Sequence, residues 1–149
     1  MKVVITGGGG FLGQVLAKEI LTRKQLRSET SMQTVTGLIL ADICEPKTYL
    51  FDLHSLAKSN GIDLQIIVGD VSDMSYCKSI IGAPKNNSTD ALSVFHLGAV
   101  MSGAPPDVAL KVNLHGSINM LEATRLWQEA STSRPTFMFS SAGASDEDK

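Results

Sequence analysis

Five short apolar runs are spaced along the chain, and polar or helix-patterned segments separate them. None of the runs alternates apolar and polar positions, as the strands of a sheet with one solvated face would. Continuous apolar runs of this length predict strands of a parallel sheet that is covered on both faces. The predicted strands are Lys2–Thr6, Leu38–Ala41, Leu64–Val68, Ala91–Leu97 and Thr136–Ser140.

Apolar residues recur at helical spacing in two longer segments. After four consecutive glycines, this spacing predicts an amphipathic helix from Phe11 to about Leu26. Farther along the chain, Asp107 suits the N-cap of the longest helix, which is expected to reach about Ala130. The apolar row of this helix comprises Leu110, Leu114, Ile118 and Leu121.

The other connections are shorter or lack a period. Turn residues without any period predict the loops Ser28–Thr36 and Gly82–Asp90. The segment Pro46–Asn60 is ambiguous and suggests one short helix. Ser72 or Asp73 can cap a further helix that ends before the second loop.

Five strands that alternate with four helices define an α/β chain. Right-handed crossovers and a glycine-rich first turn favour a doubly wound parallel sheet, the Rossmann fold, with the strand order 3-2-1-4-5. We expect one nucleotide-binding domain over residues 1–141. Residues 142–149 are expected to be a charged tail where the fold is truncated.

The glycines after the first predicted strand carry the main chemical signal. Gly8, Gly10 and Gly13 fit the pattern G-x-G-x-x-G, and Gly7, Gly10 and Gly13 fit the related pattern G-x-x-G-x-x-G. Such glycines permit a tight turn, let the backbone approach a pyrophosphate, and let the helix pack closely on the strand. A diphosphate would rest on bare amides of this turn, at the positive end of the helix. The alternatives are a flexible loop or another nucleotide-using protein, such as a methyltransferase.

A carboxylate follows the second predicted strand. At this position Asp42 can accept hydrogen bonds from the hydroxyls of the adenosine ribose, and it would repel a 2′-phosphate, so NAD is favoured over NADP. Asp42 lies farther from Gly13 than the usual spacing of about 20 residues, and the polar insert Ser28–Thr36 accounts for the difference. The alternative is a plain acidic residue at a strand end.

Composition and charge exclude several classes of protein. Of the 149 residues, 43% are hydrophobic and 19% are charged, and the net charge of −2 provides no basic excess for nucleic acid or an anionic membrane. Two cysteines cannot form a metal cluster or a disulfide framework, and no apolar run is long enough to span a bilayer. A cytoplasmic domain without a metal is expected. His96 lies inside an apolar strand and is predicted to be a hydrogen-bonded core residue.

Five motifs occur in a characteristic order: Thr6–Gly13, Gly69–Asp73, Val94–Ala99, Asn113–Ser117 and Phe137–Ser141. Together they resemble the extended short-chain dehydrogenases/reductases, the NAD-dependent epimerase/dehydratase family. This resemblance implies a Rossmann fold, an NAD cofactor and a reaction at a hydroxyl of a sugar or sugar acid. The insert before the second strand and the stretch Val100–Gly103 resemble a branch that oxidises a four-carbon sugar acid.

The resemblance implies roles for residues on the adenosine side of the cofactor. The backbone of Phe11 and Leu12 would meet the pyrophosphate. Asp70 would accept a hydrogen bond from the exocyclic amine of adenine, and Val71 would pack on the ring. Without the resemblance, Asp70 would be read as a turn residue.

Other implied roles concern the nicotinamide side and the substrate. Leu97, Gly98 and Ala99 would lie against the nicotinamide ribose, although the family more often has Ala at the position of Gly98. Asn113 would support the cofactor region, and Ser141, or the adjacent Ser140, would be the active-site hydroxyl. Without the resemblance, Asn113 would be a solvent-facing helix residue and Ser141 a small residue at a strand end.

Hydride transfer in this family requires a Tyr-x-x-x-Lys helix after the fifth strand, where Tyr exchanges a proton and Lys lowers the pKa of Tyr. Tyr49 and Tyr76 are the tyrosines of this chain, and the residues four positions later are Leu53 and Ile80. We therefore expect the NAD-binding portion of an enzyme, inactive by itself, that takes a sugar-like substrate only with the remaining half.

Truncation would also leave apolar surface exposed. The edge of the fifth strand and the apolar row of the longest helix, a face that packs in dimers of the family, would lack cover, so self-association is expected. A non-catalytic NAD(H)-binding regulatory module is the alternative function, because it would need the same pocket without the catalytic pair.

Overall fold

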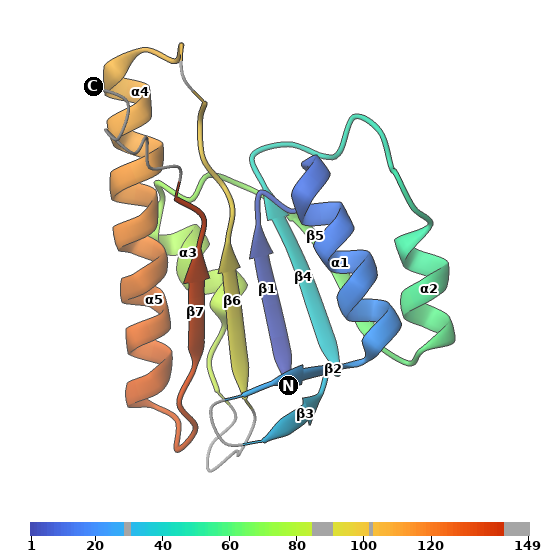
Figure 1. Cartoon of the computed structure of the whole chain (residues 1–149). Coiled ribbons are helices and arrows are strands. Elements are labelled where there is room, and N and C mark those ends of the chain that lie inside the picture. The colour runs from blue at the N-terminus through green and yellow to red at the C-terminus, as the bar shows by residue number, and fades with distance from the viewer. Residues whose placement is uncertain (29–30, 85–90, 102, 142–149) are drawn as a thin grey trace, which may run out of the picture.

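The computed structural model describes residues 1–28, 31–84, 91–101 and 103–141. Its centre is a parallel sheet with the strands β1 (Lys2–Thr6), β4 (Gly37–Asp42), β5 (Asp63–Val68), β6 (Leu92–His96) and β7 (Thr136–Phe139) (Figure 1). The strands lie in the order β5-β4-β1-β6-β7, which reads 3-2-1-4-5 when they are numbered among themselves along the chain. The predicted doubly wound α/β fold is confirmed.

Helices cover both faces of this sheet (Figure 1). They are α1 (Phe11–Arg23), α2 (Leu53–Ser59), α3 (Met74–Ile81), α4 (Pro106–Ala109), the π-helical segment η1 (Leu110–Gly116) and α5 (Ser117–Glu129). Alternate residues of each inner strand enter two separate cores. Val3 and Ile5 of β1 pack with α1 and α2, whereas Val4 packs with α3 and α5. A strand that is buried on both faces needs apolar side chains at successive positions, which explains the continuous apolar run of β1.

The outer strands differ from the prediction that all five are covered on both faces. Exposed and partly buried residues alternate in β5, where Asp63 and Gln65 are exposed. In β7, Met138 and Phe139 are exposed. The reason is that the helices pack mainly on β1, β4 and β6, whose residues supply most strand positions of the two cores.

The first helix is shorter than predicted. It ends at Arg23 rather than near Leu26, because Lys24 adopts a left-handed backbone conformation with φ of 60°. The amide of Lys24 donates to the oxygen of Ile20 (2.9 Å) and closes the last turn. A residue that favours this conformation, such as glycine, would have marked the helix end in the sequence, and Lys24 does not.

The predicted loop Ser28–Thr36 is partly wrong. β2 (Gln25–Arg27) and β3 (Met32–Thr34) form a two-stranded antiparallel sheet of their own. Each strand has three residues with an exposed, partly buried, exposed pattern. Strands this short carry too few positions to show a period in the sequence.

The longest helix begins earlier than predicted and contains an irregular segment. Pro105, and not Asp107, is the N-cap residue, and it makes no side-chain capping bond. Proline suits a helix start because it has a fixed φ and no amide to leave unpaired. At the end of η1, Gly116 packs on Val71 so closely that a Cβ there would lie 2.7 Å from Val71 Cγ2.

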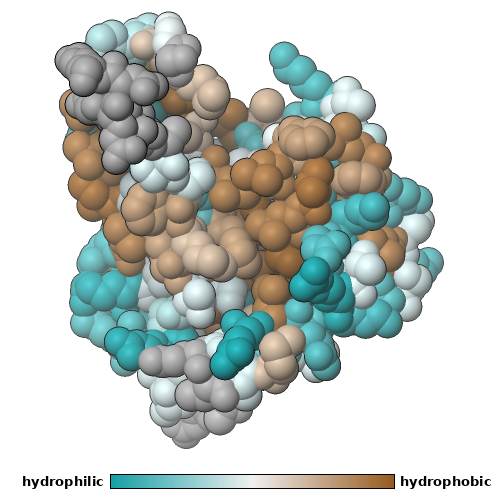
Figure 2. All heavy atoms as spheres, viewed as in Figure 1, coloured by the Kyte–Doolittle hydropathy of each residue, from teal (hydrophilic) through white to brown (hydrophobic). Residues whose placement is uncertain are grey.

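The apolar row of this helix lies on the surface of the chain. Figure 2 shows hydrophobic residues along the upper part of the helix, at the left edge of the molecule. Its members are each about half exposed, between 49% and 52%: Leu110, Leu114, Ile118 and Leu121. The predicted exposure is confirmed, and self-association through this face stays a prediction.

The remaining predicted elements agree with the structure where it describes them. The ambiguous segment contains α2, and Asp73 caps α3 by accepting a hydrogen bond from the amide of Ser75 (2.8 Å). Residues 85–90 of the second loop and the tail 142–149 lie outside the described residues. None of the described helices combines the length and the apolar character that crossing a bilayer demands.

We predict that Gly13→Ala destabilises the fold, because its Cβ would meet the oxygen of Gly7 and lie 2.7 Å from the Cα of Gly8. The free energy of unfolding should fall by about 1–3 kcal/mol, the usual cost of overpacking. Urea denaturation of the variant and the parent chain measures it.

Gly37→Ala is the matched control, because a Cβ at Gly37 would meet only Asp63 O at 3.9 Å. This variant should stay within about 0.5 kcal/mol of the parent chain. Equal losses in the two variants would contradict the prediction.

Candidate functional site

A cavity of about 510 Å³ opens at the carboxyl ends of β4, β1 and β6. The chain leaves β1 toward β4 on one side and reaches β6 on the other side only later, so a crevice forms where the connections diverge. The lining residues come from five segments: Gly7 and Gly10, Ala41–Ile43, Gly69–Val71, Leu97–Val100, and Val108 with Lys111 and Val112.

The glycine turn leaves three amides at the start of α1 without a helical partner. The first bond within α1 runs from the amide of Gln14 to the oxygen of Gly10 (3.0 Å), so the amides of Phe11, Leu12 and Gly13 precede it. Gly10 is the N-cap and has no side chain to satisfy them. The helix start therefore offers donors and a partial positive charge to an anion.

The amides of Gly8, Gly9 and Gly10 in the turn are already bonded. The amides of Gly8 and Gly10 each donate to a backbone oxygen at 3.1 Å. The amide of Gly9 donates to Oδ2 of Asp42 at 2.9 Å. The amides at the start of α1 thus stay available for a phosphate.

Asp42 is held at the edge of the glycine turn. Its Oδ1 accepts from the amide of Ile43 (2.7 Å), in addition to the bond from Gly9. A Cβ at Gly9 would lie 3.1 Å from Oδ2 of Asp42 and 3.3 Å from Cγ of Pro46. Gly9 is not a fixed position of either glycine pattern, but four consecutive glycines followed by a strand-end acid could have indicated this contact.

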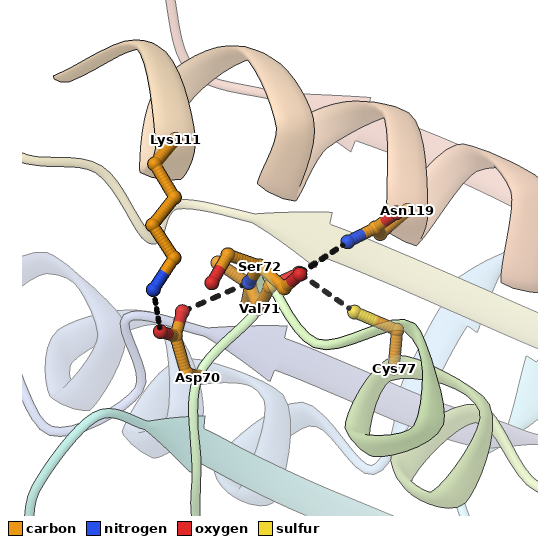
Figure 3. Close-up of polar contacts among 6 residues, drawn as sticks. All are labelled: Asp70, Val71, Ser72, Cys77, Lys111 and Asn119. Carbon is orange, nitrogen blue, oxygen red and sulfur yellow. Dashed lines mark hydrogen bonds and ion pairs between the residues drawn. The ribbon is translucent and has the colours of Figure 1, made fainter. Parts of the chain in front are cut away.

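Asp70 follows β5, beside the end of β4, where the amide of Gly69 donates to the backbone oxygen of Asp42 (2.8 Å). Its Oδ1 accepts from the amide of Ser72 (2.8 Å), and its Oδ2 lies 3.2 Å from Nζ of Lys111 (Figure 3). The bond from the Ser72 amide, with a smaller contribution from Lys111, lowers the pKa of Asp70. Sequence reasoning missed Lys111, because nothing in the chain marks which residue of the long helix faces this wall.

The neighbouring residue Val71 is fixed through its backbone. Nδ2 of Asn119 donates to the oxygens of Val71 (3.1 Å) and Ser72 (2.9 Å), and the thiol of Cys77 donates to the oxygen of Val71 (3.1 Å) (Figure 3). These bonds tie the segment after β5 to α3 and α5. Val71 therefore presents its side chain to the cavity from a rigid support.

The segment after β6 forms the far wall of the cavity. The amide of Gly98 donates to Oγ1 of Thr6 (3.1 Å). Oδ1 of Asn113 accepts from the amide of Val100 (2.8 Å), and Nδ2 of Asn113 donates to the oxygen of Val100 (3.1 Å). Asn113 does not line the cavity itself and instead holds this wall in place.

Besides Asn113, four predicted site residues do not line the cavity with a side chain. The side chains of Phe11 and Leu12 are largely exposed, at 75% and 57%, which suits contact through the backbone alone. Gly13 is buried beneath the turn. Ser141 is exposed after β7 and does not line the cavity.

His96 lies at the end of β6 and is buried, as predicted. Nδ1 of its ring lies 2.6 Å from Oγ1 of Thr6, and Nε2 lies 3.1 Å from Oγ of Ser117. Burial lowers the pKa of His96. The ring is therefore a neutral, fully bonded core group at neutral pH.

Other reactive side chains do not gather at the cavity. The hydroxyl of Tyr76 donates to the oxygen of Ile67 (2.7 Å), and burial raises its pKa to about 12. Burial also raises the pKa of Cys77 to about 11. Across the described part of the chain, no three His, Cys, Asp or Glu residues are grouped so that they could hold a metal ion.

Comparison with known proteins identifies relatives in sequence. The model of the 3-beta hydroxysteroid dehydrogenase/isomerase family matches residues 4–130. D-erythronate dehydrogenase of Cupriavidus necator is 34% identical over 131 residues, and that of Haemophilus influenzae is 30% identical over 145 residues. The matches cover 84% and 95% of this chain but only 35% and 38% of those enzymes.

Solved structures share the fold at lower identity. Uronate dehydrogenase from Agrobacterium tumefaciens is 19% identical with a TM-score of 0.61, over 95% of this chain and 40% of its own. UDP-glucose-4-epimerase from Stenotrophomonas maltophila, solved with bound NAD and formylated UDP-arabinopyranose, is 19% identical with a TM-score of 0.62, over 99% of this chain and 40% of its own.

We predict that acid destabilises the chain through His96. The unfolded chain binds a proton as the pH falls below 6.5, the ordinary pKa, whereas the native ring resists protonation. The stability that His96 contributes is therefore complete above pH 6.5 and is lost as the pH falls through its lowered native pKa. Melting temperatures between about pH 7.5 and about pH 5.5 measure this loss.

Two histidine variants separate this effect from others. His115 is exposed on η1, so His115→Gln should retain the fall in melting temperature. His96→Asn should start from a lower melting temperature but show a flatter dependence on pH. The same slope in both variants would refute the role of His96.

Proposed function

Since the chain belongs to the 3-beta hydroxysteroid dehydrogenase/isomerase family, of the NAD-dependent epimerase/dehydratase type, we propose that its cavity binds NAD. The chain would be the cofactor-binding portion of a dehydrogenase that acts on a hydroxyl of a sugar acid. The observation that carries this proposal is the contact of Asp42 with Gly9, beside three amides that precede the first bond of α1.

The diphosphate would bind the amides of Phe11, Leu12 and Gly13, where the helix dipole favours negative charge. Asp42 would accept hydrogen bonds from the adenosine ribose. Because Gly9 and Ile43 already hold both of its oxygens, the carboxylate needs no reorganisation on binding. The proposed preference for NAD over NADP follows from the charge of Asp42, which a 2′-phosphate would approach closely.

The two ends of the dinucleotide would lie on opposite walls. Asp70 and Val71 would receive the adenine, and Leu97, Gly98 and Ala99 would line the nicotinamide ribose. The cavity of about 510 Å³ joins both walls to the glycine turn, so one extended ligand can contact all of them. When bound, NAD would accept a hydride from the substrate.

The proposed substrate class rests on the sequence relatives. Both are D-erythronate dehydrogenases, and this chain spans 35–38% of their length. Ser141 is the proposed substrate-binding hydroxyl, because it follows β7 at the carboxyl edge of the sheet.

We predict that the chain binds NAD more tightly than NADP in calorimetric titrations. Asp42→Asn keeps the side-chain shape but removes the charge, so NAD binding should weaken by about tenfold or more. The same variant should narrow the difference between NAD and NADP, because the repulsion of the 2′-phosphate is gone.

Asp63→Asn is the matched control. Asp63 is an exposed acid at the amino end of β5, at the opposite edge of the sheet from the cavity. This variant should bind both nucleotides as the parent chain does. Absence of binding heat with NAD, or equal affinity of the parent chain for NAD and NADP, would overturn the proposal.

We predict no steady NADH production by this chain alone. Neither tyrosine of the sequence is followed by lysine four positions later, and general acid–base catalysis typically contributes about 10²–10⁴-fold. Absorbance of NADH with NAD and a panel of sugar acids tests it. Sustained turnover would contradict the prediction, whereas turnover only after adding the remaining part of a D-erythronate dehydrogenase would agree with it.

A further inference from the structure

A chain of hydrogen bonds connects side chains beneath the cavity. Oγ1 of Thr6 lies 2.6 Å from Nδ1 of His96, and Nε2 of His96 lies 3.1 Å from Oγ of Ser117. The hydroxyl of Ser117 donates to the backbone oxygen of Asn113 (2.7 Å). These bonds join the last residue of β1, the last residue of β6 and the long helix. The two bonds of the His96 ring join it to residues that are 90 and 21 positions away in the sequence.

The donor and the acceptor of each hydrogen bond in this series follow from the bonds at its two ends. Because the hydroxyl of Ser117 donates to Asn113, its oxygen must accept from Nε2–H of His96. In a neutral imidazole Nδ1 is then the acceptor, so the hydroxyl of Thr6 donates to it. The oxygen of Thr6 in turn accepts from the amide of Gly98 (3.1 Å). All donors therefore point from Gly98 toward Asn113.

Both ends of the chain of bonds act on one wall of the cavity. At one end Thr6 holds the amide of Gly98. At the other end, the backbone oxygen of Asn113 accepts from Ser117. The side chain of Asn113 makes two hydrogen bonds to the backbone of Val100. The segment from Leu97 to Val100 is thus hydrogen-bonded at Gly98 and at Val100, and His96 links the residues that make these two contacts.

This wall lies on the opposite side of β1 from Asp42, because β4 and β6 flank β1 on its two sides. A dinucleotide whose diphosphate lies on the glycine turn and whose adenosine ribose reaches Asp42 must place its other half toward β6. The bonded wall is therefore the part of the cavity that the nicotinamide half would contact, and the adenosine half would not.

We propose that His96 is a positioning residue that sets the segment Leu97–Val100 against the nicotinamide half of the cofactor, through Thr6 on one side and Ser117 with Asn113 on the other. This inference rests on the proposed function, because it names which half of NAD depends on the bonds. Thr6 and His96 are both buried, at 0% and 3% exposure, so water does not compete for their hydrogen bonds.

Ser117→Ala tests this proposal with a small change outside the cavity. It removes the acceptor of His96 Nε2–H and the donor to Asn113. Thr124→Val is the matched control, because the hydroxyl of Thr124 also belongs to α5 and also donates to the carbonyl four residues earlier, Met120 (2.8 Å), but makes no hydrogen bond to His96. Thr124 is buried and Ser117 is partly buried. Ser117→Thr keeps the hydroxyl and serves as the rescue variant.

The readout is the affinity for NAD compared with that for ADP, which lacks the nicotinamide half. Ser117→Ala should weaken NAD binding by about tenfold, the effect of one lost hydrogen-bonded support, and leave ADP binding within about twofold. Thr124→Val should change neither affinity, and Ser117→Thr should restore NAD binding. Loss of both affinities alike, or of neither, in Ser117→Ala would overturn the inference.

The outcomes distinguish this inference from the proposed function. If the unaltered chain binds neither NAD nor ADP, the proposed function fails. If it binds both and Ser117→Ala does not separate them, only the positioning role fails.

A second readout needs no ligand. Nitrogen-15 NMR of the imidazole should show the proton on Nε2 of His96 in the unaltered chain, and a proton on Nδ1 would overturn the assigned direction of the bonds.

Discussion

The candidate site depends on how closely backbone segments approach one another at the glycine turn. A Cβ at Gly7, whose φ is 67°, would lie 2.9 Å from the nitrogen of Gly98, and a Cβ at Gly8 would lie 2.8 Å from Cβ of Leu40. Bare backbone therefore contacts β4 on one side and the segment after β6 on the other. Without this approach the helix start, Asp42 and the far wall could not share one cavity.

The polar groups of that cavity are held before any ligand arrives. Asp42 accepts from two backbone amides, and Asp70 accepts from the amide of Ser72. Carboxylates fixed in this way lose little conformational entropy on binding, which favours affinity for an extended ligand. The same bonds leave the turn with fewer free amides than its glycines suggest, because the amide of Gly9 donates to Asp42.

Two cores, one on each face of the sheet, support this arrangement. The core with α3 and α5 holds the wall after β5, because Asn119 and Cys77 reach the backbone of Val71 from those helices. The long helix also anchors the wall after β6, through Asn113 and Ser117. Packing of one helix thus positions two walls of the cavity, while the apolar row along η1 and α5 lies on the surface.

The sequence by itself determined the strands, the α/β class and the glycine turn, because continuous apolar runs and glycine spacing reflect local requirements of backbone and burial. It could not reveal the short hairpin β2–β3, the helix end at Lys24 or the start at Pro105, since these depend on a few residues with weak intrinsic preferences. Only the tertiary structure decided that Lys111 faces Asp70 and that His96 joins Thr6 to Ser117. Those contacts join residues distant in sequence, and side-chain direction in a packed fold is set by all its neighbours together.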